Sequence, residues 1–478
     1  MTAPTLFWFR QDLRLSDNPG LDALGDRPAL LVFVLDDSAA GAWALGGAQR
    51  WWLHHSLAAL EASLRDRGTV LHLAHGDATW IIPELAERIG AAEVIAGRLY
   101  EPWARRRDSA IADALEKVGR KLVLHTHSLL HEPHRIRTGT GKPYSVYTPF
   151  SRAIFGLGEP HPPIPAPKRL TPVAQAPEGV TLDALELLPR APEPDWWREF
   201  PRHWTPGEAG AARRIEEFGR RAIDRYDDSR NTPGIDGTSR LSPHLRFGEI
   251  SPRQVWYAAR EAGLGGEATF LKEVLWREFS YHTLWHRPDM PEQPLREEFA
   301  RFPWQVSKPA LTAWQRGLTG YPIVDAGMRQ LWRMGWMHNR VRMIAASFLV
   351  KHLLHPWQEG EAWFWDTLVD GDLANNAASW QWVAGSGADA SPYFRVFNPM
   401  LQSEKFDADG AYIREWVPEL AGLPTQHIHK PWEAPAAVLA RAGVTLGRDY
   451  PRPIIEHGEG RARALAAYAS LRAEGDAA

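Results

Sequence analysis

The sequence has no cysteine among its 478 residues and no long apolar run. The missing cysteine excludes disulfides, thiolate metal sites and a cysteine nucleophile, and we expect no metal site. No stretch of about 18 apolar residues is present, so we expect no transmembrane helix. The N-terminus also lacks the basic and then apolar layout of a signal peptide. We therefore expect a cytoplasmic protein that does not contact membranes.

Charge of one sign is also lacking, because the formal net charge is only −3. Any contact with DNA must then come from a local basic face. Arginine is frequent in residues 213–280 and 329–342, but a charged helix face is usually only solvated. No G-x-G-x-x-G follows the first apolar run and no Walker sequence occurs. The N-terminal part therefore lacks the usual sign of a dinucleotide or nucleoside triphosphate site.

The length exceeds what one hydrophobic core normally supports, so two domains are expected. Residues 1–130 alternate short apolar runs with amphipathic segments. The runs predict strands at 5–10, 29–36, 69–74, 93–96 and 121–126, and the segments between them predict helices at 47–67, 80–90 and 103–119. This alternation is typical of α/β folds. We predict a doubly wound, parallel, five-stranded sheet.

Residues 131–206 are rich in proline, which fixes φ and removes a backbone donor, so we predict an extended linker on the surface. Helical periodicity dominates residues 207–478 and predicts a large all-α domain. The predicted helices cover 211–224, 253–262, 269–285, 324–335, 340–354 and 360–368.

Tryptophan is abundant, with 23 residues, and the run DGDLANNAASWQW at 370–382 concentrates acids, amides and indoles. Carboxylates and amides can tune a polar ring system in a cofactor, and indoles offer flat surfaces for stacking on a base or ring. Indole is also easily oxidised, so a row of indoles can pass an electron. The alternative is a tryptophan-rich helical core. The flanking polar residues weaken that alternative, because polar groups resist burial without partners.

Together with this run, four other segments closely resemble the photolyase/cryptochrome family, in the family's order and over nearly the whole chain. They are FWFRQDLRLSDNP at 7–19, TSRLSP at 238–243, GWMHNR at 335–340 and SPYFRVFNP at 391–399. The nearest similarity is to photolyases of cyclobutane pyrimidine dimers, of class I or class III type. The resemblance implies an antenna-binding domain at 1–130 and a helical domain at 207–478 that binds FAD and DNA lesions. It implies a monomer whose partner is DNA containing these dimers.

The segment GTSRLS at 237–242 taken alone predicts either a phosphate contact or a helix N-cap. The resemblance makes it part of the FAD diphosphate site, with Tyr226, Thr238, Ser239, Arg240, Leu241 and Ser242 as contacts. At the ring end it implies Arg342, Asp370, Asp372 and Asn376. Asn376 matches the position facing flavin N5, where plant cryptochromes carry aspartate, so the asparagine favours repair.

The residues that match those around a bound dimer are Glu273, Trp276, Asn339, Met343 and Trp382. Glu273 and Trp276 are three apart and would share a helix face, although Glu273 alone is typical of a surface acid. The (6-4) photolyases carry histidine at both positions 339 and 343, so a cyclobutane dimer is favoured. Contacts to the DNA strand are expected at Arg230, Arg340, Arg395, Gln402 and Lys405.

Trp380, Trp357 and Trp304 match the photoreduction chain of the family, although each could be plain packing. With Glu273 and Asn376 they form the expected catalytic set. Whether Trp332 and Trp336 belong to a second branch stays open. In the loop at 100–105, Trp103 and Ala104 replace the Asn-Glu pair of the enterobacterial folate site. A folate (methenyltetrahydrofolate) bound elsewhere in the domain is our first expectation for the antenna, with deazaflavin or flavin as alternatives.

The resemblance leads to a light-driven enzyme in which reduced FAD donates an electron to the dimer and the ring splits. The main alternative is a cryptochrome-type blue-light receptor without repair activity. Against it stand Asn376, the pairing of Glu273 with Met343, and a chain that ends soon after residues 461–471. A third class, a dark flavin oxidoreductase, predicts a hydride-donor site, and no nicotinamide-type fingerprint is present.

Overall fold

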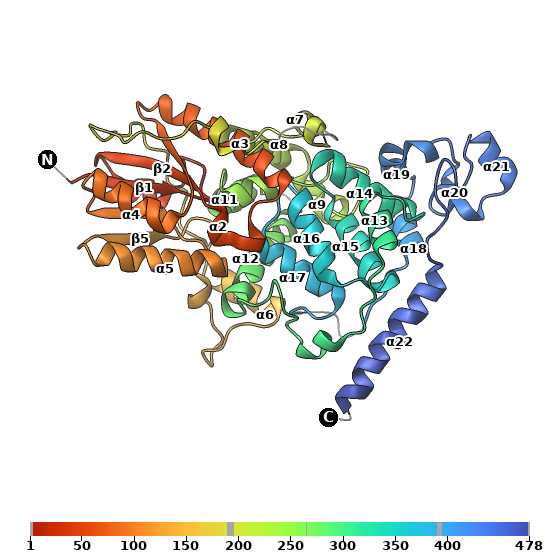
Figure 1. Ribbon diagram of the computed structural model, residues 1–478. Coiled ribbons are helices and arrows are strands. Elements are labelled where there is room, and N and C mark those ends of the chain that lie inside the picture. Colours follow the sequence, from red (N-terminus) through yellow and green to blue (C-terminus); the bar gives the residue numbers. More distant parts are fainter. Residues whose placement is uncertain (1–2, 189–195, 264, 390–393, 477–478) are drawn as a thin grey trace.

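The computed structural model describes residues 3–188, 196–263, 265–389 and 394–476. Five parallel strands form one sheet at one end of the molecule (Figure 1). They are β1 (Thr5–Phe9), β2 (Ala29–Leu35), β3 (Leu71–His75), β4 (Glu93–Gly97) and β5 (Lys121–His125), in the order β3-β2-β1-β4-β5. The predicted parallel, five-stranded α/β fold is confirmed.

Side chains on β1 alternate between the two faces of the sheet, and each face is covered by helices. Phe7 and Phe9 pack in one core with α3, whereas Leu6 and Trp8 pack in another core with α4 and α5. This period of two lets the inner strands bury side chains on both faces, as expected for a parallel sheet covered by helices. The edge strand β5 is less buried. The helices of this part are α1 (Pro19–Leu24), α2 (Asp37–Ala40), α3 (Gly47–Arg65), α4 (Ala78–Arg88) and α5 (Pro102–Glu116).

The described part of the segment at 131–206 is only partly extended, because short helices interrupt it, so the expectation of an extended chain is wrong there. Helix α6 (Tyr147–Gly156, 10 residues) lies within it and packs in one core with α12 (Glu267–His286). Pro149 does not prevent the helix because it lies in the first turn, where no backbone donor is needed. The extended part does exist, since Pro172 and Val180 pair with Ala29 and Leu73 of the sheet. Residues 189–195 lie outside the described residues.

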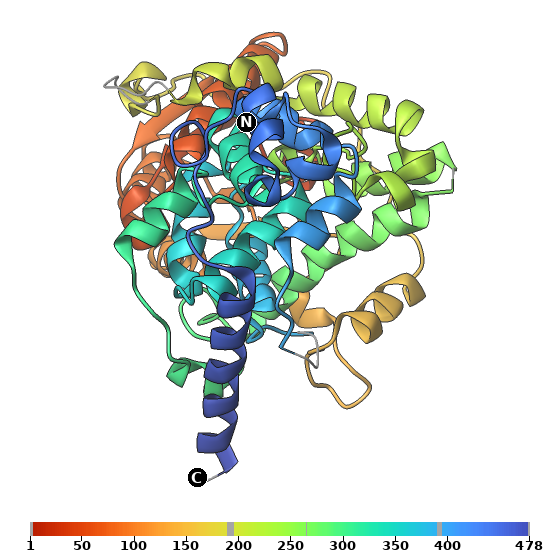
Figure 2. The same ribbon diagram turned by 90° about the vertical axis from the view of Figure 1, so that its right-hand side faces the viewer.

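The second region is helical, as predicted. Its helices are α7 (Phe200–His203), α8 (Glu208–Arg221), α9 (Tyr226–Ser229), α10 (Ser242–Phe247), α11 (Pro252–Ala262), α12, α13 (Lys308–Gln315), α14 (Pro322–Met334), α15 (Asn339–Ser347), α16 (Trp357–Thr367), α17 (Leu373–Ala384), α18 (Pro399–Phe406), α19 (Ala411–Trp416), α20 (Thr425–Ile428), α21 (Ala436–Arg441) and α22 (His457–Asp476). Helix α22 projects beyond the body of the molecule (Figure 2). In the described parts of the chain, no helix has the length and apolar character needed to cross a bilayer.

One predicted helix is interrupted. Residues 340–354 form α15 followed by a π-helical turn at Phe348–His352, and Leu354 has a φ of 56°. A π-turn inserts an extra residue and ends the regular α-helical pattern. The run at 370–382 forms the start and body of α17, which begins after its N-cap Asp372. Ser391–Tyr393, the start of the fifth resembling segment, lie outside the described residues.

Buried polar groups join the two regions. The guanidinium of Arg14 is fully buried and donates to the carbonyl oxygens of Gly248 (2.9 Å), Asp17 (2.7 Å) and His127 (2.9 Å). On α12, both carboxylate oxygens of Glu278 accept from the backbone N–H of Leu130 at 3.0 Å. The sheet and the helices are therefore tied by hydrogen bonds that have no access to water.

Candidate functional site

The helical region encloses a cavity of about 510 Å³, which is within the usual range for a small-molecule site. Most residues predicted for the cofactor and the lesion line it. From the cofactor set these are Tyr226, Ser239, Leu241, Ser242, Arg342, Asp370, Asp372 and Asn376. From the lesion set they are Arg230, Glu273, Trp276, Asn339, Met343 and Trp382. Sequence segments that are more than 150 residues apart therefore meet at one site.

The acidic end of the cavity is held in place by protein partners. Arg342 donates to both oxygens of Asp370, at 2.8 and 3.1 Å. Asp372 caps α17 by accepting from the backbone N–H of Asn375 at 2.9 Å, and its other oxygen accepts from the hydroxyl of Tyr281. Both acids are buried, and charge-assisted hydrogen bonds offset the cost of burying them. Asp370 is thus paired with a cation and Asp372 with neutral donors, so both acids at this end of the cavity have protein partners.

Asn376 presents its amide to the same cavity. Its N–H group donates to the backbone carbonyl of Glu361 at 3.0 Å, which leaves the amide oxygen available to a ligand. The carboxyl of Glu361 is fully buried, and burial raises its pKa well above the ordinary value. The side-chain amide of Asn376 carries no charge, so it can lie next to an anionic ring without repelling it.

Two hydroxyl-bearing residues of the segment at 237–242, Ser239 and Ser242, also line the cavity. Arg214 fixes this segment by donating to the carbonyl oxygens of Ser239 (2.8 Å) and Thr238 (2.9 Å). Thr238 and Arg240 do not belong to the lining that the described residues form. Arg240 has a φ of 49°, pairs with Asp236 at 3.1 Å and lies over the ring of Trp336.

Glu273 and Trp276 project from α12 toward the cavity, as their spacing predicts. Arg230 Nη1 lies 2.7 Å from Glu273 Oε1, so a residue predicted to contact DNA is paired with a residue predicted to contact the lesion. Burial raises the pKa of Glu273, and the positive charge of Arg230 opposes that rise. The carboxyl is thus held by one partner and still borders the cavity.

The other residues that are predicted to contact the DNA strand do not belong to the cavity lining. Arg340 is tied to Asn231 (2.6 Å) and to the sulfur of Met343 (3.7 Å), so it helps to fix the Met343 side chain. Arg395 is exposed and borders a second, much smaller cavity of about 30 Å³ together with Trp382. Gln402 and Lys405 lie on α18, with the lysine exposed.

The predicted photoreduction chain should run from a buried indole at the cavity to an indole that solvent can reach, and the burial of its three members follows this direction. Trp380 lines the cavity and is 2% exposed, Trp357 begins α16 and is also 2% exposed, and Trp304 is partly exposed. Gly360 lets α16 approach α17, because a Cβ at this position would lie 2.1 Å from the ring of Trp380. The first two indoles therefore belong to one close helix pair.

Trp332 and Trp336, left open by the sequence, belong to separate ring contacts. Trp332 stacks between Trp196 (5.2 Å between centroids) and Trp363 (5.9 Å). Trp336 meets Trp204 at 6.3 Å, and its ring lies 5.9 Å from the Arg342 guanidinium. Indole contacts thus reach the acidic end of the cavity from this side as well.

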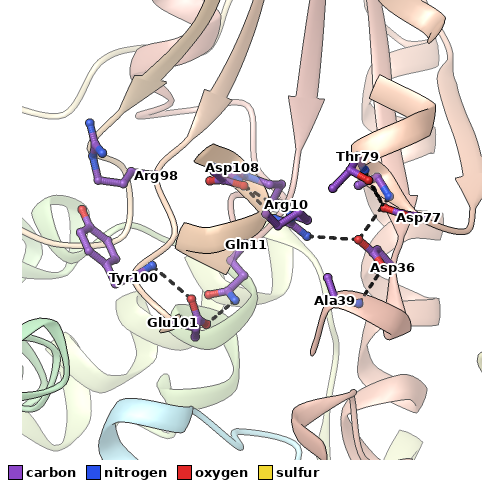
Figure 3. Close-up of polar contacts among 12 residues, drawn as sticks. Arg10, Gln11, Asp36, Ala39, Asp77, Thr79, Arg98, Tyr100, Glu101 and Asp108 are labelled. Carbon is purple, nitrogen blue, oxygen red and sulfur yellow. Dashed lines mark hydrogen bonds and ion pairs between the residues drawn. The ribbon is translucent and has the colours of Figure 1, made fainter. Parts of the chain in front are cut away.

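At the carboxyl edge of the sheet, buried charges surround the end of β1 (Figure 3). Arg10 Nη1 lies 2.6 Å from Asp108 Oδ2, and Gln11 donates to Glu101 at 2.7 Å. Arg10 Nε and Nη2 and Trp8 Nε1 are buried without a hydrogen-bond partner. The strand order reverses between β1 and β4, and ligands of doubly wound sheets bind outside the carboxyl ends at such a point.

A comparison with known proteins identifies the family. The curated deoxyribodipyrimidine photo-lyase of Agrobacterium fabrum is 51% identical over 98% of this chain and 98% of its own. The chain belongs to the photolyase/cryptochrome family. Family models for the DNA photolyase domain and for the FAD-binding domain of DNA photolyase match residues 5–168 and 270–470. FAD binding is thus a property of the family domain that forms the cavity.

Other members of the family show how closely the fold is shared. The crystal structure of a class III photolyase from Agrobacterium tumefaciens, 51% identical, superposes with a TM-score of 0.95 over 99% of this chain and 98% of that one. A Synechocystis cryptochrome, 28% identical, gives a TM-score of 0.88 over 98% and 99%. Cryptochrome-2 of Arabidopsis thaliana is 38% identical over 95% of this chain and 77% of its own. Photolyases and cryptochromes of this family therefore share one fold.

Some cavity residues of this family member were not predicted from the sequence. Arg277 and Ser280 line the cavity from α12, four and seven residues after Glu273. Residues at this spacing share a helix face, so extending the helical pattern from Glu273 would have found both. Arg246 also lines the cavity and donates to the carbonyl oxygen of Gly371 at 2.5 Å. It lies four residues after Ser242 on α10, so the same helical spacing would have predicted it.

Proposed function

We propose that this protein is a light-dependent DNA repair enzyme, a deoxyribodipyrimidine photolyase, which splits cyclobutane pyrimidine dimers into the two pyrimidines. One observation carries the proposal: the same cavity is lined by the ring-facing acids and amide and by Glu273, Trp276 and Met343. A photoreceptor needs the first set alone, whereas electron transfer to a lesion requires both sets at one site. The relatives that are 51% and 41% identical over nearly their whole length are named as this enzyme.

When bound, FAD supplies the light-excited electron donor, and the chain binds and orients it. The cavity suits such a molecule because its lining includes the hydroxyls of Ser239 and Ser242 and a charge-balanced Asp370–Arg342 pair. The proposed contacts are Tyr226, Thr238, Ser239, Arg240, Leu241 and Ser242 at the diphosphate and Arg342, Asp370, Asp372 and Asn376 at the ring. Arg214 fixes the segment that contains Thr238 by donating to its carbonyl oxygen.

At the lesion, Glu273 would hydrogen-bond the carbonyl and imide edge of a pyrimidine, with Arg230 fixing its carboxyl. Trp276 and Trp382 would stack on the extruded dimer, whose removal from the duplex costs less because its own stacking is already damaged. Asn339 and Met343 stand where a (6-4) enzyme carries two imidazoles. Without an imidazole acid at either position, the site favours the cyclobutane dimer.

Trp380, Trp357 and Trp304 would deliver electrons from the surface when the cofactor is oxidised. The support is the gradient of burial from 2% at Trp380 to partial exposure at Trp304. Arg340, Arg395, Gln402 and Lys405 would hold the DNA strand around the mouth of the cavity. We also expect the enzyme to act as a monomer, which gel filtration of the loaded protein tests.

For the antenna, we propose a folate (methenyltetrahydrofolate) at the carboxyl edge of the sheet, with deazaflavin or flavin as the alternatives. Arg10 Nε, Arg10 Nη2 and Trp8 Nε1 are buried donors without a partner, and a ring rich in carbonyl and nitrogen acceptors would satisfy them. Ala104 is fully buried, which removes it from the enterobacterial mode of folate binding. Extraction of the purified protein and mass spectrometry of the released chromophores distinguish the three.

The proposed repair activity is tested with purified, chemically reduced protein and an oligonucleotide that contains one cyclobutane dimer. Under blue light the dimer should disappear, and in the dark it should remain. A matched oligonucleotide with a (6-4) product is the control and should stay unrepaired. Photoreduction of bound FAD without any dimer splitting would instead support the cryptochrome-type receptor, and folded protein that cannot bind FAD would overturn both readings.

A further inference from the structure

Trp276 lies between two neighbours, the cavity on one side and helix α6 on the other. It lines the cavity, while its indole stacks on the ring of Tyr147 with 3.6 Å between centroids and 7° between planes. Tyr147 comes from the segment expected to be a linker and is 7% exposed. One face of the indole is therefore covered by Tyr147, while the residue as a whole still borders the cavity.

The phenol of Tyr147 is fixed to the helix that carries Trp276. Its hydroxyl donates to the carbonyl oxygen of Lys272 at 2.7 Å, one turn before Trp276 on α12. Burial raises the pKa of Tyr147 above its ordinary value, so the hydroxyl keeps its proton and remains a donor at physiological pH. The hydrogen bond and the ring contact together leave the Tyr147 ring little freedom to turn.

Two further contacts hold the same segment on α12. The backbone N–H of Tyr144 donates to His282 Nε2 at 3.0 Å, and the ring of Phe150 lies 5.2 Å from Phe279 and 5.1 Å from His282. Burial lowers the pKa of His282 to about 4, so its ring is neutral and can accept this bond. Helix α6 is thus anchored along α12 on both sides of Trp276.

We propose that Tyr147 is a positioning residue for lesion recognition: it fixes the plane of Trp276 so that one face of the indole is presented to a flipped base. A partly exposed tryptophan on a helix can adopt several rotamers, and each lost rotamer lowers the entropic cost of stacking on a ligand. Tyr147 restricts the indole before DNA arrives. This inference rests on the proposed function, because it requires Trp276 to stack on the lesion.

The test measures the ratio of affinities for dimer-containing and undamaged duplex in four variants that retain FAD. In Tyr147→Leu the ratio should fall by about twofold to tenfold, the range expected from losing an aromatic pair. Tyr147→Phe keeps the ring and should keep most of the ratio. Ile154→Ala, a change at another buried residue of α6, is the matched control and should leave the ratio unchanged. Trp276→Ala should lower it most.

The outcomes separate the inference from the function on which it rests. If Trp276→Ala lowers the ratio and Tyr147→Leu does not, the positioning role is wrong and the repair assignment stands. If Trp276→Ala itself discriminates normally, the proposed lesion site is wrong. If Tyr147→Leu lowers the affinity for damaged and undamaged DNA by the same factor, Tyr147 has only a packing role. If the leucine variant does not fold, Tyr147→Met, which keeps a large apolar side chain without a flat face, must show the same fall.

Discussion

The helical region and the sheet region each hold an arginine–aspartate pair with a buried carboxylate, and the two pairs have different surroundings. Asp370 and Arg342 border an open cavity of about 510 Å³, and both acids at that end have protein partners. At the sheet edge Arg10 is paired with Asp108, yet two of its nitrogens are buried with no partner. The first site is complete before a ligand binds, whereas the second gains hydrogen bonds only from an acceptor that reaches it.

Trp380→Phe gives the largest contrast, because it removes the indole next to the cavity. We expect photoreduction of oxidised FAD to be lost. Chemically reduced enzyme should still repair dimers, because a cofactor that is already reduced needs no electron from the three tryptophans. Trp8→Phe at the sheet edge is the matched control and should photoreduce normally. The measurement is flavin absorbance under blue light with an external reductant. Near-normal photoreduction in Trp380→Phe would mean that the contacts around Trp336 or another branch carry the electron.

Replacing Arg342 or Arg10 by alanine should cost the protein a different bound molecule in each case. Arg342→Ala leaves Asp370 buried and unpaired, which costs about 3–5 kcal/mol, and we expect the FAD content of the purified protein to fall. Arg10→Ala should retain FAD and lose the antenna chromophore. Absorbance spectra of the gel-filtered proteins report both contents. A loss of FAD in Arg10→Ala but not in Arg342→Ala would reverse the comparison.

Glu278, at the junction between the two regions, should make the stability of the fold depend on pH. Burial raises the pKa of Glu278 from 4.5 to about 7, so between these values the folded state holds a proton that the unfolded state has released. Stability therefore falls as pH rises through this window, by on the order of 1–3 kcal/mol. Glu278→Gln can still accept from Leu130 and should flatten this part of the profile. Urea unfolding at pH 5, 6 and 7.5 measures it, and identical profiles would contradict the assignment.

Two helical glycines test how closely α16 and α17 pack. An alanine Cβ at Gly360 would lie 2.1 Å from the Trp380 ring, whereas a Cβ at Gly219 in α8 meets no atom within 4 Å. Gly360→Ala should destabilise the protein by about 1–3 kcal/mol through overpacking and disturb the flavin spectrum. Gly219→Ala should stabilise it by about 0.5–1 kcal/mol. Thermal unfolding compares them, and an equally tolerated Gly360→Ala would show that Trp380 can move.

The smallest effect is expected from a surface charge. Arg395→Ala should reduce the slope of log affinity against log salt by about 0.9, which corresponds to one phosphate contact. It should lower the affinity for damaged and for undamaged DNA by similar factors. Arg88→Ala, at a half-exposed arginine of the sheet region, should leave the slope unchanged. Fluorescence anisotropy over a salt series measures both slopes. If the two variants behave alike, the DNA face does not include Arg395.

The sequence predicts the sheet well because its inner strands are buried on both faces and bounded by helices of ordinary length. It predicts the cavity residues on α12 and α17 through the family motifs. It fails at residues 147–156, because proline content suggested an extended chain, whereas Pro149 lies in the first turn, where a helix accepts it. The π-turn at Phe348–His352 leaves no mark in the periodicity, so one long helix was predicted there.

Pairings between distant segments were also beyond the sequence. Nothing in the local pattern shows that Arg230 would pair with Glu273, or that Tyr147 would stack on Trp276. Both contacts depend on how α6 and α9 lie against α12, which is a property of tertiary packing. Periodicity identifies which face of a helix is covered, but it does not identify the neighbour that covers it.

The buried guanidinium of Arg14 has a consequence for how the protein melts. It bonds carbonyl oxygens at Asp17, His127 and Gly248, so the sheet cannot unfold while the helices stay native without exposing all three acceptors and breaking every bond. We expect heat to produce one cooperative transition even though the chain has two kinds of architecture. For the same reason, a chimaera that exchanges only the sheet with a relative must recreate both sides of this contact.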